Sequence, residues 1–264
     1  MLPGVDWHTR YTQQARWTHD LRQYLYQRVG LNNARRVLDL GCGTGVLLEE
    51  LYSQTTPSAC APFVAGLDLA RTSLLMAIRN APGAFLTQGD AHTLPYSAYT
   101  FDITLCHFLL LWVEKPLWVV QEMKRVTRPG GFVLALAEPD YGGRIDYPEA
   151  LHILGEWQSE SLRQQGADPT IGRKLAGIFH QAGLQDVETG VLGGQWSGLP
   201  SDEDWEQEWD VLESDLKTSE ACDAREIADL RALDRAAWQR GERVLFVPTF
   251  YAQGRVLSTQ NTRL

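Results

Sequence analysis

Short apolar runs and amphipathic segments alternate along the first half of the chain. The runs have the length and the flanking turn residues of buried strands, and the segments between them carry apolar residues at helical spacing. We expect strands at residues 36–40, 63–67, 84–88, 101–106 and 131–137, and helices at 45–53, 71–80 and 116–126. The alternation predicts a parallel sheet that helices cover on both faces.

The pattern differs toward the two ends of the chain. An N-terminal helix or helix pair is expected before Gly30, which can end it. Pro248 lies inside the last expected strand, and a proline removes a hydrogen bond from a strand ladder. A bulge in the strand, or an end to strand pairing at Pro248, would reconcile the proline with the expected strand. The expected elements are helices at 7–29, 150–165 and 171–182, and strands at 184–193 and 243–256.

The stretch between the last two expected strands is helical in pattern and acidic. Trp205 and Trp209 recur on one helix face, and residues 201–230 carry twelve Asp and Glu against Lys217 and Arg225. A solvated helical face explains this charge, and attraction of a cationic substrate is the alternative. We expect one domain over residues 1–264, with an N-terminal helical segment at 1–30 and a helical cap insertion at 198–241.

The turn after the first strand holds three glycines at alternate positions, in the run Val-Leu-Asp-Leu-Gly-Cys-Gly-Thr-Gly. Glycine accepts positive φ and lets a ligand approach the backbone, and the N–H groups at the start of a helix favour an anion. The spacing is not that of a dinucleotide fingerprint, and the charge of Asp39 would oppose a pyrophosphate. A ligand with both an ammonium and a carboxylate fits better.

This run resembles the first motif of the class I S-adenosylmethionine-dependent methyltransferases, in their small-molecule type 11 form. Further stretches resemble that family in the same order, at residues 63–69, 89–91, 101–105 and 128–131. The resemblance implies an α/β fold: a Rossmann-like doubly wound sheet of about seven strands, mostly parallel with the last strand antiparallel. It also implies S-adenosyl-L-methionine as cofactor and S-adenosyl-L-homocysteine as product.

The resemblance also implies which residues bind the cofactor. The first acid and the glycines would face its amino-acid part, with His107 beside the methionine. Asp68 would meet the ribose hydroxyls and Asp90 the adenine amino group, with Leu69 and Ala91 flanking the ring. The implied cofactor-binding residues are Asp39, Gly41, Gly43, Gly45, Asp68, Leu69, Asp90, Ala91 and His107.

Methyl transfer from a sulfonium is an in-line displacement that requires positioning and, for some acceptors, removal of a proton. His107 is the first candidate for the base, since histidine titrates near neutral pH. Its alternative role is to shape the cofactor pocket. Asp140 is a second candidate for the base, with helix or turn capping as its alternative role. His92 follows the turn that would meet the adenine, and we expect it at the edge of the site rather than as the base. We expect no metal site.

Aromatic residues near the same rim are candidates for substrate contact. Tyr11 is included because N-terminal helices in this family often close over the cofactor. Core packing is the alternative role of each. A cluster of them would suit a flat or apolar substrate, or a cation held by aromatic faces. The candidates are Tyr11, Phe108, Trp112 and Tyr141.

Composition narrows the class of partner. The net charge of −9 argues against nucleic acid, because such binding requires a basic patch. No stretch has the apolar length that crosses a bilayer, and the N-terminus lacks a secretory pattern. Cysteines at 42, 60, 106 and 222 have no metal or redox spacing. We expect a cytoplasmic monomer or homodimer that acts on a small molecule.

Three functions remain open. The first is methyl transfer to an O, N or C atom of a small molecule, which the ordered motifs favour. The second is an NAD(P)-dependent oxidoreductase, which the glycine spacing and Asp39 disfavour. The third is a non-catalytic cofactor-binding or regulatory protein with the same fold.

Overall fold

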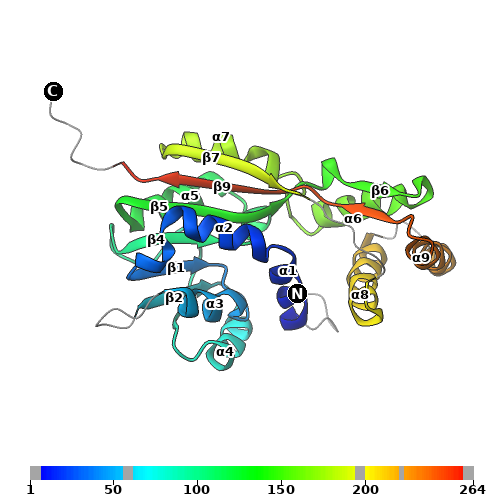
Figure 1. Ribbon diagram of the computed structural model, residues 1–264, viewed down its shortest axis with the longest axis horizontal. Coiled ribbons are helices and arrows are strands. Elements are labelled where there is room, and N and C mark those ends of the chain that lie inside the picture. Colours follow the sequence, from blue (N-terminus) through cyan, green and yellow to red (C-terminus); the bar gives the residue numbers. More distant parts are fainter. Residues whose placement is uncertain (1–6, 56–61, 194–199, 220–222, 258–264) are drawn as a thin grey trace.

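The structure, a computed structural model, describes residues 7–55, 62–193, 200–219 and 223–257. Within these residues seven strands form one sheet in the order β3-β2-β1-β4-β5-β9-β7 (Figure 1). The first five pair in parallel, and β9 is antiparallel to both of its neighbours. This sheet confirms the expected fold class. Its strands are β1 (Arg36–Leu40), β2 (Phe63–Asp68), β3 (Phe85–Gln88), β4 (Phe101–Cys106), β5 (Thr127–Pro139), β7 (Gln185–Leu192) and β9 (Thr249–Arg255).

The carboxyl ends of the central strands meet at one edge of the sheet. Leu40 pairs with Leu67 of β2 on one side and with Cys106 of β4 on the other. The chain runs outward from β1 through β2 and β3, and then returns to the opposite side of β1 at β4. Such a reversal of strand order opens a crevice beyond the strand ends, where ligands bind in open α/β sheets.

Helices cover both faces of the sheet. One face packs against α5 and α7, and the other against α2, α3 and α4. Leu48 and Leu51 of α3 are fully buried in the second core, where truncation to alanine costs about 2–5 kcal/mol per residue. These helices are α2 (His19–Val29), α3 (Val46–Gln54), α4 (Arg71–Asn80), α5 (Pro116–Val126) and α7 (Leu175–Gln181).

The expected N-terminal helix is a pair, since α1 (Trp7–Trp17) and α2 are separated at Thr18. The Thr18 side chain bonds back to the carbonyl of Gln14 at 3.0 Å. Gly30 ends α2 with a left-handed φ of 66°. In Figure 1, α1 lies between the sheet and α8. Arg10 joins α1 to α8 through a 2.5 Å ion pair with Glu208.

The cap is defined here as α8 (Asp202–Ser219) and α9 (Ala224–Gln239). It shares an apolar cluster with α6 (His152–Gln164). Asp234 holds the cap together from within, because it accepts hydrogen bonds from the indoles of Trp205 and Trp209 at 2.7 and 3.0 Å and from Arg243 at 2.6 Å. The buried polar groups of this cluster therefore satisfy one another.

The expected strand around Pro248 is two strands in different sheets. β8 (Val244–Phe246) pairs with β6 (Ile145–Tyr147), and pairing to β5 and β7 begins only at β9. Pro248 lies between β8 and β9. Of the two expected alternatives, a bulge or an end to pairing, the structure therefore has the end to pairing. The short 3-10 helices are η1 (Leu31–Asn33), η2 (Leu110–Trp112), η3 (Tyr141–Gly143), η4 (Glu149–Leu151) and η5 (Gly172–Lys174).

Cys42 and Cys106 are buried free thiols, and Cys60 and Cys222 lie outside the described residues. Of the helices in the described ranges, none combines the length and the apolar character needed to span a membrane.

Candidate active site

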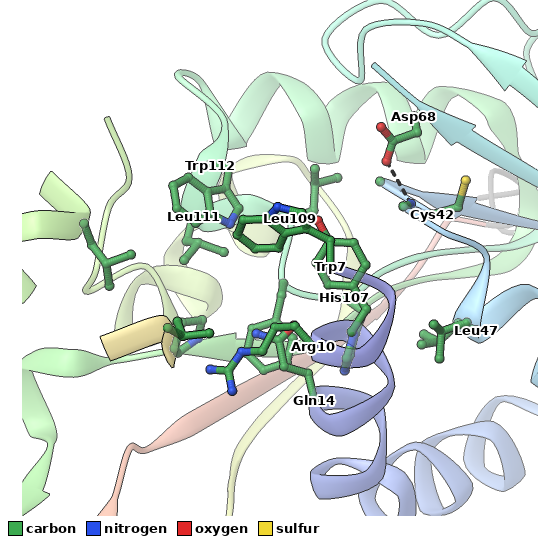
Figure 2. Close-up of a pocket in the computed structure, with 18 of the residues that line it drawn as sticks. Trp7, Arg10, Gln14, Cys42, Leu47, Asp68, His107, Leu109, Leu111 and Trp112 are labelled. Atoms are coloured by element: carbon green, nitrogen blue, oxygen red, sulfur yellow. Dashed lines mark hydrogen bonds between the residues drawn. The ribbon is translucent and has the colours of Figure 1, made fainter. Parts of the chain in front are cut away.

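A cavity of about 650 Å³ lies beyond the carboxyl ends of β1 and β4. This volume is within the range of small-molecule sites. Figure 2 shows residues of α1, of the turn after β1 and of the loop after β4 around it. Side chains of α6 and α8 complete the wall on the cap side. The cavity thus lies between the sheet edge and the cap, with α1 along it.

The turn between β1 and α3 forms the first part of the wall. Gly41, Gly43 and Gly45 all have positive φ, at 69°, 52° and 86°. A side chain at Gly41 would meet Leu109 at 2.8 Å, and one at Gly43 would meet the ring of Tyr11 at 2.9 Å. The turn therefore needs glycine for its backbone conformation and for the close approach of groups above it.

Two carboxylates face this turn. Asp68 accepts hydrogen bonds from the amides of Gly43 and Ala70, both at 2.8 Å (Figure 2). Asp39 lines the cavity, is 3% exposed, and has no hydrogen-bonded partner among the described residues. Burial and the charge of Asp68 raise the pKa of Asp39 well above its usual value. A buried carboxylate without a partner is unfavourable until a cation pairs with it.

The loop after β4 is held by Glu138, near the end of β5. Its buried carboxylate accepts hydrogen bonds from the amides of Leu109, Leu110 and Leu111 at 3.0, 2.9 and 3.2 Å. Burial raises the pKa of Glu138 to about 7, although these three bonds act in the opposite direction. The carboxylate therefore fixes the segment that carries Leu109 and Leu111 into the cavity.

The structure brings the four aromatic candidates together on the cavity wall. Tyr11 lies over Gly43, and burial raises the pKa of Tyr11 to about 12. Phe108 has a φ of 52°, which is a strained value for an aromatic residue. Trp112 is 47% exposed at the mouth, and Tyr141 begins η3. Their contacts with a substrate stay predictions.

His107 also lines the cavity, but its surroundings do not suit a base. Its Nε2 lies 2.8 Å from the Thr18 hydroxyl, which in turn accepts a hydrogen bond from buried Arg22. Burial, and then the charge of Arg22, lower the pKa of His107 to about 3. The imidazole is therefore a very weak proton acceptor at neutral pH. A role of His107 as the base stays a prediction, and these surroundings favour its alternative role in shaping the wall.

Asp140, the second candidate for the base, is already paired. Its carboxylate is 3% exposed and is held by Arg173, through the guanidinium Nε and through Nη2 at 2.7 Å. It is not among the residues that line the cavity. The pairing with Arg173 favours the structural alternative for Asp140, and its role as a base stays a prediction.

The residues expected around adenine lie at the carboxyl ends of β2 and β3, outside the cavity lining. Leu69 is 70% exposed and Ala91 is buried. Asp90 accepts hydrogen bonds from the amide of His92 at 2.9 Å and from its ring at 2.7 Å, if that nitrogen carries the proton. These bonds lower the pKa of Asp90. Contact of these residues with adenine stays a prediction.

Comparison with known proteins decides the family. Residues 38–135 match the model of the family described as methyltransferase domain. The chain is 30% identical to a demethylmenaquinone methyltransferase of Lysinibacillus sphaericus over 197 residues, which cover 67% of this chain and 80% of that protein. This chain belongs to the class I S-adenosylmethionine-dependent methyltransferases. It spans between 45% and 64% of the length of the first curated relatives that it matches.

Solved structures agree with this methyltransferase in fold. A putative methyltransferase from Bacillus halodurans superposes with a TM-score of 0.60 at 16% identity, covering 91% of this chain and all of the other. A phosphoethanolamine N-methyltransferase of Haemonchus contortus, solved with S-adenosylmethionine, gives 0.53 at 16% identity and covers 85% and 49%. The glycine cradle and the unpaired Asp39 fit the cofactor of the family, since it carries an ammonium beside a carboxylate.

Several cavity residues of this methyltransferase were not expected from the sequence. They come from α1, α6 and α8, where no motif marks them. Glu138, which holds the neighbouring loop and is not part of the wall, did give a signal, as an acid near the end of an otherwise apolar strand. The groups of the cavity wall that were missed are Trp7, Arg10, Gln14, Gln158, Gln165 and Asp215. No group of His, Cys, Asp and Glu in the described ranges is arranged to hold a metal ion.

Proposed function

We propose that this chain transfers a methyl group from S-adenosylmethionine to an O, N or C atom of a small molecule in the cavity. The observation that carries the proposal is the Asp39 carboxylate, buried and without a partner beside a turn of three left-handed glycines. An ammonium would pair with it, and the carboxylate of the same ligand would meet the turn amides.

The other cofactor contacts follow from the placement of the strand ends. Asp68 lines the cavity and keeps acceptor capacity beyond its two amide bonds, so it can take ribose hydroxyls. Leu69, Asp90 and Ala91 follow β2 and β3 and are proposed to meet the adenine. The bound cofactor supplies an activated methyl group on a sulfonium.

Catalysis would then rest on orientation and exclusion of water. His107 is the one histidine of the described cavity wall, and its lowered pKa makes it a weak base. Positioning alone can supply several kcal/mol of a reaction barrier. The site therefore suits an acceptor that reacts as a free lone pair or loses its proton readily. Tyr11, Phe108 and Trp112 would cover the reacting groups.

Calorimetric titration with S-adenosylhomocysteine tests the cofactor step directly. We expect Asp39→Asn to weaken binding by at least about tenfold, which is about 1.4 kcal/mol. Asp229→Asn removes the same charge from an exposed position of α9 and serves as the matched control.

Two outcomes would reject the proposal. One is no detectable heat with the wild-type chain at millimolar S-adenosylhomocysteine. The other is thermal stabilisation by a nicotinamide cofactor and none by S-adenosylhomocysteine, which would favour the oxidoreductase.

A further inference from the structure

The cap side of the cavity holds a second buried carboxylate. Asp215 of α8 lines the cavity together with Gln158 and Gln165 from α6 and its C-terminal end. It is 5% exposed. In Figure 1, α8 stands on the opposite side of α1 from the sheet, and Asp215 shares the cavity with Gly41 and Gly43 of the glycine turn.

The orientation of Gln158 is fixed by its neighbours. Its side-chain oxygen accepts a 2.5 Å hydrogen bond from Arg144, which is itself paired with Asp146 at 2.5 Å. The amide nitrogen of Gln158 must therefore point the other way, where it donates to Asp215 Oδ2 at 3.2 Å. Gln165 donates to Asp215 Oδ1 at 3.0 Å. Each carboxylate oxygen thus has one neutral donor and keeps a free acceptor position.

Asp215 has no positively charged partner in the part of the chain that the structure describes. Its hydrogen-bond donors are two neutral amides, which offset only part of the desolvation of a charge, and the charge of Arg10 acts on it without a direct bond. Arg10 is the one Lys or Arg of the described cavity wall. Its guanidinium is bonded to Glu208 at 2.5 Å and to Gln13 at 2.8 Å. The Asp215 carboxylate is consequently incomplete without a cation from outside.

The surroundings of this carboxylate favour a cation further. The rings of Trp7, Trp112 and Tyr141 line the same cavity, and aromatic faces attract positive charge. Of the eight acids on α8, Asp215 is the one that lines the cavity, and five of the others are paired with arginines. The sequence left open whether the acids of residues 201–230 serve solvation or attract a cation. One of these acids, Asp215, lies inside the cavity.

We propose that Asp215, oriented by Gln158 and Gln165, binds a positively charged nitrogen of the substrate, so that the substrates of this chain are small amines. This inference rests on the proposed methyl transfer. The carboxylate stabilises the protonated nitrogen, which has no lone pair to accept a methyl group. The amine is therefore an anchor, and the methyl acceptor is another atom of the same molecule, held toward the glycine turn.

Three probes of similar size and different charge test the proposal: 2-phenylethylamine, 2-phenylethanol and phenylacetate. Each is titrated calorimetrically into the full chain, with and without S-adenosylhomocysteine. We expect the amine to bind at least about tenfold more tightly than the other two. Asp215→Asn should reduce that preference to less than about twofold, while Asp210→Asn, an exposed change on the same helix, keeps it.

The wild-type comparison alone can overturn the inference, should Asp215→Asn fail to fold. Equal or tighter binding of the alcohol or the acid contradicts it, as does no binding of the amine at millimolar concentrations. The inference is also contradicted if a folded Asp215→Asn protein still binds the amine more tightly than the alcohol and the acid. Failure of the cofactor proposal is visible separately, as the absence of binding of S-adenosylhomocysteine to the wild type, and the titrations without it still decide the role of Asp215.

Discussion

The two sides of the cavity are built in different ways. On the sheet side, one continuous turn with glycines at positive φ supplies backbone groups. On the cap side, Gln158 reaches Asp215 across 57 positions of sequence, and Arg144 orients it from a third segment. Backbone geometry set by residue type can be recognised locally, whereas a side-chain network exists only after distant segments have packed.

The buried carboxylates of the two sides also differ in their surroundings. Asp39 lies near other charged groups, and its pKa is raised by burial and by Asp68 against the influence of Arg22. Asp215 lies between two neutral amides, and its pKa is raised mainly by burial. On the sheet side two carboxylates thus act on each other, whereas on the cap side Asp215 is the one carboxylate of the described wall and Arg10, already paired with Glu208, acts on it only weakly. This difference is what we expect if the first binds a zwitterionic group and the second a single cation.

Glu138→Ala should have the largest effect, because it affects the loop that contributes to both sides. Three buried amides would lose their acceptor, and we expect the free energy of unfolding to fall by about 3 kcal/mol. Urea denaturation measures the change. Glu114→Ala, an exposed acid in the next turn of the chain, is the control. A loss below about 0.5 kcal/mol would show that Glu138 does not hold the loop.

Gly43→Ala tests the sheet side alone. The new methyl group would lie 2.9 Å from the Tyr11 ring, at a φ that alanine rarely adopts. We expect affinity for S-adenosylhomocysteine to fall by about 100-fold, or about 2.7 kcal/mol, with amine binding at Asp215 unchanged. Gly177→Ala, in α7 with no contact nearer than 3.8 Å, is the control. A similar loss of amine binding would mean that the two sides are not independent.

Two buried groups, His107 and Glu138, should change the stability of the protein with pH in opposite directions. Lowering the pKa of His107 from 6.5 to about 3 means that the unfolded chain takes up a proton first. That contribution to stability is therefore lost as the pH falls from 6.5 toward 3. Raising the pKa of Glu138 from 4.5 to about 7 does the reverse, and its contribution is lost as the pH rises from 4.5 to 7.

Urea denaturation of His107→Asn and Glu138→Gln between pH 4.5 and 6.5 measures these contributions. Relative to His107→Asn, wild-type stability should rise with pH by about 1–2 kcal/mol. Relative to Glu138→Gln, it should fall by a similar amount. Parallel curves for the wild type and both variants would contradict the placement of the two groups.

Trp209→Phe should have the smallest effect on stability, and it tests how Asp234 holds the cap together. Asp234 would lose one of its donors and keep Trp205 and Arg243, so we expect a loss of about 1 kcal/mol in the free energy of unfolding. Affinity for S-adenosylhomocysteine should stay within about twofold. Trp118→Phe, at an exposed position of α5, is the control. A large loss of cofactor affinity would show that the cap also shapes the sheet side.

The sheet and its covering helices were predictable because their signals are local. Residues 36–40 and 101–106 form strands with the expected bounds, and α4 and α5 also match. A helix pair was one of two expected forms of the N-terminal segment, and the structure places its break at Thr18. Pro248 signalled a conflict, and the partner strands of β8 and β9 resolved it.

The candidate site was predictable only in part, for the same reason. Gly41, Gly43, Phe108 and Tyr141 lie on the cavity wall because they follow strand ends, which a sequence pattern can locate. The lowered pKa of His107 comes from burial and then from the charge of Arg22, which lies in α2, far from His107 in the sequence. Asp140 is neutralised by Arg173, which comes later in the chain and carries no motif. Ion pairs between residues far apart in the sequence can be recognised only in the folded structure.

The position of α1 has a kinetic consequence. This helix touches the glycine turn through His8, whose ring nitrogen lies 2.9 Å from the Thr44 hydroxyl, and it touches the cap through Arg10 and Glu208. Tyr11 of the same helix lies over Gly43. A cofactor bound at this turn would therefore lie against an element that also borders the substrate side of the cavity. We expect one opening motion to admit both ligands, so that exchange of the spent cofactor sets the upper limit on turnover.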